Sequence, residues 1–267
     1  MNGGVQIRTE ADAAGRTRIV ELATTAPLGA KVTGDCVHLI GTAAAPLDGD
    51  VVTIELVVGD GTQLTIGTVA ATMAWPARGH ASPSLMIVRA RIGDGATLRW
   101  LPEQLVPVRG CRHQLRCDVQ LAPSATVVWR EEVILGRAGE PPGLLDAELR
   151  VTRGATPLLH QQLQIDGTPA QAHRAGSLLG GARAVGSVLV AGPQLPEHCA
   201  QVASPQLRGA VLDLEAGGRL ASATSSSAVA LRRWLLERTA GMAPPQAQLP
   251  PHRSRATPDN PQEMVSR

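Results

Sequence analysis

The 267-residue sequence contains no tyrosine and no phenylalanine, and Lys31 is its only lysine. Its aromatic residues are four tryptophans: Trp75, Trp100, Trp129 and Trp234. Proteins that stack the bases of a single strand need closely spaced aromatic faces, so this composition argues against that class. A phosphate-binding loop needs a lysine after a glycine-rich turn, and no such motif is present. The sequence therefore argues against single-strand nucleic-acid binding and P-loop nucleotide hydrolysis.

The sequence also has no large excess of positive or negative residues and no long apolar run. The chain has 25 basic and 23 acidic residues, with no extended run of Lys or Arg, which argues against nucleic-acid binding. No apolar run reaches the roughly 18–20 residues that span a bilayer. Met1–Gln6 has no apolar signal-peptide core. We therefore expect a cytoplasmic protein without membrane partners, whose four cysteines are reduced thiols.

Catalytic motifs are absent as well. There is no G-x-S-x-G nucleophile elbow. A pair of carboxylates for acid–base catalysis must converge in space, and no spacing in this sequence indicates such a pair. We expect a protein that is not an enzyme and that has no tightly bound cofactor.

A turn followed by a short apolar strand is what the chain does contain, and it recurs. The turns lie at Asp60-Gly61, Asp94-Gly95, Pro123-Ser124 and, more weakly, Arg153-Gly154, at intervals of 34, 29 and 30 residues. Intervals of 20–50 residues are typical of stacked supersecondary units, none of which buries its own apolar face alone. The repeat predicts a stack of β-strands that presents a binding surface.

The rest of the pattern predicts an all-β-dominated fold, a stacked or helical arrangement of many short strands with one or two helices. We expect a flexible N-terminus over residues 1–18, a single domain over 19–240 and a proline-rich disordered tail over 241–267. A C-terminal helix is predicted from about Ser225 to Arg238, where serines offer N-caps. The predicted strands cover 19–58, 62–69, 84–92, 96–101, 113–121, 125–135, 145–153, 157–165, 184–190 and 202–215.

Two Cys-x-His pairs are candidates for direct metal binding. They are Cys36 with His38 and Cys111 with His113, and Cys117 and His198-Cys199 lie elsewhere as further soft ligands. Residues i and i+2 of a strand share a face, so each pair could offer two ligands to one Ni²⁺ or Zn²⁺ ion. The alternative is that the cysteines pack as small apolar residues, because structural zinc sites use four converging ligands.

Acidic side chains form a second group of candidates. They either hold cations or pair with Arg130 and Arg137 at strand ends. The candidates are Asp50, Glu103, Glu131 and Glu140, with Glu132 adjacent.

Several sequence blocks resemble the urease accessory protein family UreD, also called UreH. In order along the chain they are Gly49-Asp50, Ala70-Ala71-Thr72, Trp100-Leu101-Pro102-Glu103, Trp129-Arg130-Glu131 and Gly136-Arg137-Ala138-Gly139-Glu140. The Trp-Leu-Pro-Glu and Gly-Arg-x-Gly-Glu blocks are specific in combination. The resemblance extends from about Ala26 to Glu237.

The resemblance implies an all-β helical stack and a urease maturation chaperone. Such a chaperone binds the urease apoprotein and UreF, which recruits the GTPase UreG, and nickel passes through an internal tunnel. The acidic candidates Asp50, Glu103, Glu131 and Glu140 are then candidates for a transient nickel path. A direct nickel-binding metallochaperone that uses the Cys-x-His pairs is the alternative.

The sequence departs from the family pattern at two places, and the first bears on either a partner contact or the tunnel. Met73 and Trp75 stand where many members have Lys and Tyr, and Gln104-Leu105 stands where many have a proline-containing turn. We expect the partner-binding residues among Met73, Trp75, Arg232, Arg233 and Trp234. Because Trp234 is the one large apolar residue on a mostly polar helix, Trp234→Ala should lower stability by ~3–5 kcal/mol or weaken UreF binding.

Overall fold

The computed structural model describes residues 1–34, 36–77, 79, 82–167, 179, 181–193, 202–204 and 206–239. The described elements are mostly strands, with one C-terminal helix. In chain order they are β1 (Asn2–Ala11), β2 (Thr17–Thr25), β3 (Leu28–Thr33), β4 (Cys36–Gly41), β5 (Val51–Val58), β6 (Gln63–Thr68), β7 (Thr72–Ala74), β8 (Ser84–Ile92), β9 (Thr97–Leu101), β10 (Leu105–Pro107), β11 (Arg112–Leu121), β12 (Thr126–Ile134), β13 (Leu144–Arg153), β14 (Thr156–Ile165), β15 (Ala184–Ala191), β16 (Val202–Ala203), β17 (Leu207–Leu214), β18 (Gly218–Ser225) and α2 (Ala228–Thr239).

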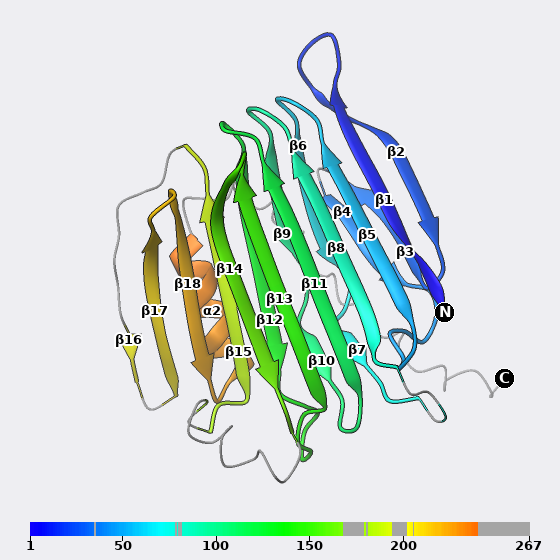
Figure 1. The fold of residues 1–267 in the computed structure, drawn as a ribbon, viewed down its shortest axis with the longest axis vertical. Coiled ribbons are helices and arrows are strands. Elements are labelled where there is room, and N and C mark those ends of the chain that lie inside the picture. The colour runs from blue at the N-terminus through cyan, green and yellow to red at the C-terminus, as the bar shows by residue number, and fades with distance from the viewer. Residues whose placement is uncertain are drawn as a thin grey trace, which may run out of the picture.

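The strands form two sheets that lie face to face (Figure 1). Sheet A has the order β14-β13-β11-β8-β5-β1-β2. Sheet B has the order β16-β17-β18-β15-β12-β9-β6-β4-β3, and the short strands β7 and β10 pair beside it. The prediction of an all-β stack with a C-terminal helix is confirmed.

The repeated turn joins the two sheets. β5 runs through the turn at Gly61 into β6, β8 runs through Gly95 into β9, and β11 runs through Ser124 into β12. Successive coils place their strands side by side in parallel, both in sheet A and in sheet B. Each coil therefore contributes one strand to each sheet, which explains the interval of about thirty residues.

The turns of successive coils bond to one another. The Gly61 N–H donates to the Asp94 carbonyl oxygen at 2.8 Å, and the Asp94 N–H donates to Oδ1 of Asp60 at 2.9 Å. In the next step the Ser124 hydroxyl donates to Oδ1 of Asp94 at 2.7 Å. Gly61 and Gly95 have φ angles of 68° and 65°, a left-handed conformation that favours glycine. The turn residues thus both reverse the chain and fix the register between coils.

The fourth turn has a different role. After Gly154 the chain returns as β14, which pairs antiparallel with β13 in the same sheet. The Arg153-Gly154 phrase therefore closes a hairpin and does not join the two sheets. It ends the run of parallel coils on the sheet A side.

Apolar rows fill the space between the sheets near the turns. Small side chains lie just after each turn: Thr62, Ala96 and Ala125 are all fully buried. The next inward positions of sheet B carry Leu64, Leu98 and Val127, and a row of sheet A carries Leu56, Ala90, Val119 and Val151. Alternation of inward apolar and outward polar residues along these strands produces this core.

The N-terminal residues differ from the sequence expectation. Within residues 1–18, β1 lies between β2 and β5 and pairs with both of them. The expected flexible N-terminus is therefore wrong for this segment, because Val5 and Ile7 extend an apolar row of sheet A and are buried. β18 was missed, since its Gly-, Ala- and Ser-rich sequence has weak strand propensity. The expected tail over 241–267 lies outside the described residues.

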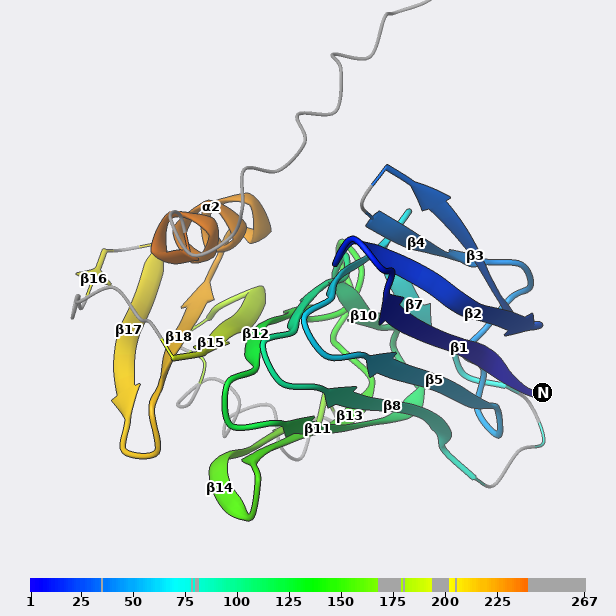
Figure 2. The same cartoon turned by 90° about the horizontal axis from the view of Figure 1, so that it is seen from above.

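Helix α2 covers the outer face of sheet B beside β15 and β18 (Figure 2). The Ser227 hydroxyl accepts the Ala230 N–H at 3.3 Å, as expected for an N-cap. Leu231, Trp234 and Leu235 are buried against the sheet. No helix in the described part of the chain is long and apolar enough to cross a membrane.

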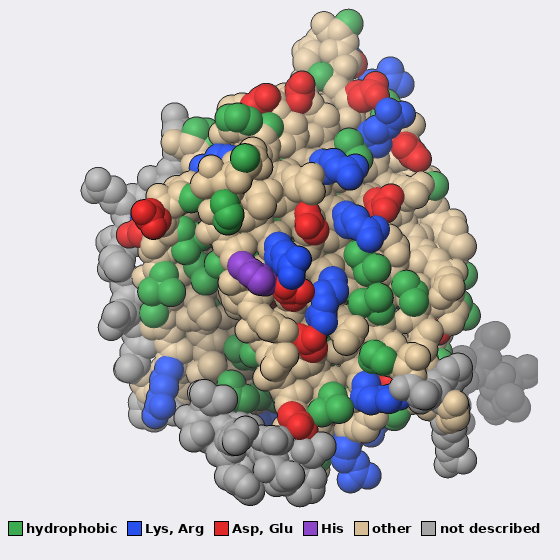
Figure 3. All heavy atoms as spheres, in the orientation of Figure 1, with side chains coloured by type: hydrophobic (Ala, Val, Ile, Leu, Met, Phe, Trp, Pro, Cys, Tyr) green, Lys and Arg blue, Asp and Glu red, His purple; other side chains and the backbone are tan. Residues whose placement is uncertain are grey.

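The outer face of sheet A is polar and carries both signs of charge side by side (Figure 3). Polar contacts join neighbouring strands. Arg89 forms an ion pair with Glu55 at 3.2 Å, and Nε2 of His160 lies 2.7 Å from a carboxylate oxygen of Glu148. The two faces of sheet A therefore differ as its alternating sequence predicts.

Candidate functional site: a cavity between the sheets

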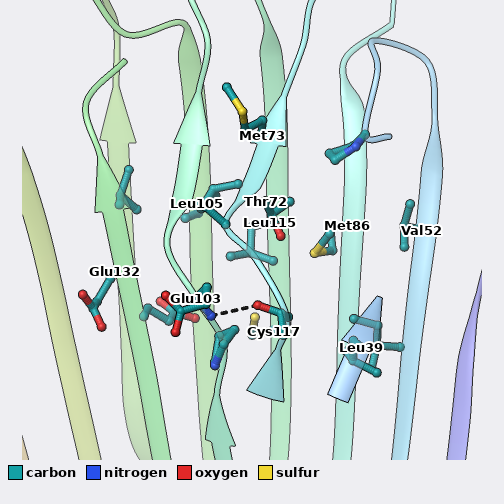
Figure 4. A pocket seen from close by; sticks show the side chains of 18 of the residues that line it. Leu39, Val52, Thr72, Met73, Met86, Glu103, Leu105, Leu115, Cys117 and Glu132 are labelled. Carbon is teal, nitrogen blue, oxygen red and sulfur yellow. Dashed lines mark hydrogen bonds between the residues drawn. The ribbon is translucent and has the colours of Figure 1, made fainter. Parts of the chain in front are cut away.

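A cavity of about 500 Å³ lies between the sheets at the ends of the strands away from the repeated turns. Its walls come from strands across the stack, from β4 on one side to β14 and β18 on the other. Figure 4 shows side chains that line it, among them Leu39, Val52, Met86, Leu115 and Cys117. The cavity thus extends across successive coils and not along a single pair of strands.

Two short strands bound the cavity on the side of sheet B. After β6 the chain forms β7, and after β9 it forms β10, which pairs in parallel with β7 and with β12. Thr72, Met73 and Leu105 of these strands line the space. The insertions between β6 and β8 and between β9 and β11 therefore hold the walls apart where the turns at the other end bring them together.

The ionisable side chains that line the cavity are three carboxylates and one thiol. They are Glu103, Glu131, Glu132 and Cys117, and no Lys, Arg or His is among the lining residues that the structure describes. Most of the remaining lining is aliphatic or Ala. Carboxylates in a water-poor, low-dielectric space attract cations strongly. The lining therefore favours a cation over an anion.

Glu131 is half-buried at the cavity wall and contacts both sheets. Its Oε1 accepts the Trp129 indole N–H at 3.0 Å, and the Cys117 thiol bonds to it from sheet A. Burial raises the pKa of Glu131, and these two bonds oppose the increase. Burial, together with the nearby Glu131, also raises the pKa of the Cys117 thiol. The two groups form a thiol–carboxyl couple that spans the two sheets.

Trp129 is held in place by a second tryptophan. Trp100 and Trp129 occupy paired positions on β9 and β12, and their rings stack with centroids 5.1 Å apart. Trp129 is 1 % exposed and Trp100 also lines the cavity. The two blocks that begin with these tryptophans therefore supply one wall of the site.

A chain of charges links the cavity to α2. Arg232 on the helix pairs with Glu103 at 2.6 Å and with Glu132 at 2.9 Å. Arg130 pairs with Glu132 at 3.1 Å and donates to the carbonyl oxygens of Leu101 and Pro102. The alternation along β12 explains the division: Trp129 and Glu131 face inward, while Arg130 and Glu132 face the helix.

The Gly-Arg-x-Gly-Glu block forms a tight turn beside the cavity. Gly136 and Gly139 have φ angles of 77° and 79°. Arg137 pairs with Glu140 at 2.8 Å and lies over the ring of Trp75, 5.0 Å from its centroid. Trp75 lines the cavity, so the turn supports the wall without entering the space.

The structure separates the acidic candidates. Glu103 and Glu131 line the cavity, whereas Asp50 and Glu140 do not. Asp50 pairs with the amino group of Met1 and accepts the Leu47 N–H at 2.9 Å. Glu140 pairs with Arg137, as one of the two alternatives for this group predicts.

The Cys-x-His candidates also lie apart. Cys36 and His38 are half-buried on the outer face of sheet B, where their neighbours Val37 and Leu39 point into the core. Cys111 and His113 are buried at the start of β11, and the Ser84 hydroxyl is 2.8 Å from Nδ1 of His113. His198-Cys199 lies outside the described residues. Among the described residues, no three His, Cys, Asp or Glu side chains form a cluster that could hold a metal ion.

The residues predicted to bind partners lie in two regions of the structure. Met73 and Trp75 line the cavity. On α2, Trp234 is buried and packs against Gly209, Arg232 is engaged by two carboxylates, and Arg233 is exposed.

Glu132 and Cys117 also line the cavity, although the sequence marks Glu132 only as a neighbour of the acidic candidates and Cys117 only as a further soft ligand. The two-residue alternation of β12 carried a signal for Glu132, but it could not tell which face a helix would cover. Cys117 belongs to an inward apolar row with Val88 and Leu149, so its sequence context favours the alternative in which the cysteine packs as a small apolar residue.

Comparison with known proteins identifies the family. The model of the UreD urease accessory protein family matches residues 1–258. The chain belongs to the UreD family. A urease accessory protein UreD of Parafrankia sp. (strain EAN1pec) is 40% identical over 256 residues, covering 86% of this chain and 84% of the relative.

Two further UreD relatives extend over similar lengths. The UreD of Frankia casuarinae is 35% identical and covers 86% of each chain. UreD 1 of Saccharopolyspora erythraea is 35% identical, covering 89% of this chain and 94% of its own length. The resemblance drawn from the tryptophan and glycine blocks is therefore confirmed, and the family supports a role in urease maturation.

Proposed function

We propose that this UreD chain is a non-catalytic maturation chaperone that binds the urease apoprotein in the cytoplasm and conducts nickel through the cavity between its sheets. UreF is its direct accessory partner in this proposal, and UreG joins through UreF. Nickel is the cargo and not a resident cofactor. The observation that carries the proposal is the cavity itself, whose ionisable lining is entirely carboxylate and thiol in the described residues.

The chemistry of the lining suits a transient passage. A closed cage of four Cys or His ligands would hold an ion tightly, whereas separate oxygen donors let it move from one site to the next. Glu131 and Cys117 offer one oxygen and one sulfur donor inside the cavity, and Glu103 and Glu132 offer oxygens nearer α2. The aliphatic remainder of the wall binds no ion, so passage depends on these few groups.

The salt bridges of Arg232 connect helix α2 to the carboxylates of the cavity, and they give the helix a role in the proposed function. Arg232 neutralises Glu103 and Glu132 while the helix is docked. A partner that contacts the exposed Arg233 or moves the helix would change how strongly these two carboxylates attract a cation. Partner binding and cation attraction are thereby coupled through one arginine.

Obstruction of the cavity tests the proposal. Leu115→Trp adds bulk to the cavity wall, and Val57→Trp places the same residue on the outer face of sheet A as a matched control. We expect Leu115→Trp to melt near the wild type, to pull down UreF and apo-urease, and to activate urease severalfold less than Val57→Trp. Full activation by a folded, partner-binding Leu115→Trp would overturn nickel passage through the cavity.

Two further arms separate the parts of the proposal. If Leu115→Trp does not fold, Ala147→Val is the smaller obstruction, since Ala147 also lines the cavity. Glu131→Gln keeps the volume and removes the charge, and it should lower activation while pull-down is unchanged. Absence of both UreF and apo-urease from pull-downs of the wild-type chain would reject the chaperone role itself.

A further inference from the structure

Cys36 and His38 direct their donor atoms toward one hollow on the outer face of sheet B. The hollow lies over Gly67, which pairs with His38 across the parallel strands β4 and β6. A Cβ atom at Gly67 would lie 3.5 Å from Nδ1 of His38 and 3.8 Å from Sγ of Cys36. Both donors therefore lie within 4 Å of one point that only the missing side chain of a glycine leaves open.

The local sequence explains this convergence. Val37 and Leu39 are buried in the core, so the alternation of β4 turns Cys36 and His38 outward together. A side chain at position 67 would separate the two donors, and glycine there allows both to lean over β6. Gly67 itself is buried beneath them. The pair is thus presented by rigid sheet structure and not by a loop.

We infer that Cys36 and His38 form a two-donor surface site for a thiophilic divalent cation such as Ni²⁺, with water completing the coordination. Thiolate and imidazole suit Ni²⁺ and Zn²⁺, whereas Mg²⁺ and Ca²⁺ prefer oxygen ligands. Metal–nitrogen and metal–sulfur bonds are about 2.0 and 2.3 Å. An ion has to lie farther from the Gly67 Cα than a Cβ atom would, so both side chains turn toward it on binding. The site lies outside the cavity and does not depend on the proposed passage.

The surroundings set the strength of the site. Partial burial raises the pKa of the Cys36 thiol, and a hydrogen bond from the Gly67 backbone N–H favours the thiolate. Lys31 is the cross-strand partner of His38 on β3, and Thr33 and Thr65 pair with Cys36. Arg99 lies one strand farther along the Cys36 row. The positive charge of Lys31 opposes a cation, so the site is expected to be moderate in affinity and exchangeable.

Titration with Ni²⁺ alone tests the site in the purified full-length chain, with Cys199→Ser introduced into every protein compared. The readouts are the thiolate-to-Ni²⁺ charge-transfer absorption and protection of Cys36 from alkylation. We expect a band that saturates at one equivalent, that is absent in Cys36→Ser and that requires at least about tenfold more Ni²⁺ in His38→Gln. Mg²⁺ should not compete.

Gly67→Ala is the decisive variant, because it fills the hollow and changes neither donor. Its added Cβ meets only ordinary van der Waals contacts, so the variant should fold. Gly41→Ala, at the end of the same strand β4, meets nothing closer than 4.0 Å and is the matched control. We expect Gly67→Ala to weaken binding strongly, Gly41→Ala to leave it unchanged and Lys31→Ala to tighten it a few-fold.

Three results would overturn the site. They are a charge-transfer band that persists in Cys36→Ser, equal binding by folded Gly67→Ala and wild type, or no Ni²⁺ binding by the wild-type chain at all. None of these results bears on pull-down of UreF and apo-urease or on obstruction of the cavity, so failure here is distinguishable from failure of the proposed function.

Discussion

The two ends of the space between the sheets differ, although the same strands build both. At the turn end, small residues follow each turn and Leu64, Leu98 and Leu56 fill the interior. At the other end, β7 and β10 are inserted and a cavity of about 500 Å³ remains. The turns therefore specify the architecture, while the insertions after β6 and β9 specify the space between the sheets that we propose to be functional.

Trp129→Ala should have the largest effect, because Trp129 lies where the packed end meets the cavity. The substitution removes a buried ring and its stack on Trp100. It also removes the indole N–H that donates a hydrogen bond to Glu131. We expect a loss of about 3–5 kcal/mol in the free energy of unfolding, measured by urea denaturation. Trp75→Ala, which is half-buried, should cost clearly less. Equal costs for the two variants would contradict the distinction between the ends.

Leu98→Ala and Leu115→Ala compare the two ends with the same chemical change. Leu98 is fully buried among packed residues of the turn end, so its removal creates a new void costing about 2–5 kcal/mol. Leu115 already borders the cavity, and its removal enlarges an existing space. We expect Leu98→Ala to be the more destabilising by about 1–2 kcal/mol in urea denaturation. The reverse order would show that the cavity end is the better packed.

His113 should make the cavity end sensitive to acid. Burial, with the nearby charge of Arg116, lowers the pKa of His113 to about 4 from an ordinary 6.5. In the unfolded chain the His113 imidazole is protonated as pH falls below about 6.5, whereas in the folded chain it is protonated only near pH 4. Stability therefore falls as pH decreases through this window, by up to about 3 kcal/mol.

His113→Gln tests this acid sensitivity. The variant should lose that part of the pH dependence of the urea midpoint, while His160→Gln on the exposed outer face of sheet A should retain it. Superimposable pH profiles for wild type and His113→Gln would refute the assignment.

Glu140→Gln should have the smallest effect. The side-chain hydrogen bond from Arg137 lowers the pKa of Glu140 to about 2. Its stabilisation is present above the ordinary pKa of 4.5 and is lost as pH falls toward 2. Because Arg137 is exposed to solvent, we expect only a small decrease in melting temperature at pH 7 that disappears near pH 2. A large decrease at pH 7 would indicate that this turn carries more of the cavity wall than its contacts suggest.

Sequence alone predicted the stack well, for physical reasons. The recurring turns, the two-residue alternation and the β-branched runs are local signals, and strands lie where most of them predict. The predicted strand over 202–215 is instead divided into β16 and β17, which pair antiparallel. The N-terminal strand was missed because Val5 and Ile7 gain their burial from β5, about fifty residues away in the chain. The turn at Arg153-Gly154 was taken as a further copy of the repeat, because a turn sequence does not indicate which sheet the next strand joins.

The site was only partly predictable. Glu103 and Glu131 were identified, but the pairing of Glu132 with Arg232 joins residues one hundred positions apart, which no local pattern encodes. The convergence of Cys36 and His38 depends on Gly67 in another coil. Strand parity indicates that two side chains share a face, whereas the space between them is decided by the neighbouring strand.

The coil-on-coil turns have a consequence for length. Parallel strands in a sheet lie about 4.8 Å apart, and every coil adds one strand to each wall of the cavity. The length of the cavity across the sheets is therefore set by the number of complete coils. A deletion of one complete unit, cut at equivalent turn positions such as Gly61 and Gly95, would shorten the span by a single strand spacing while leaving the remaining turns in register.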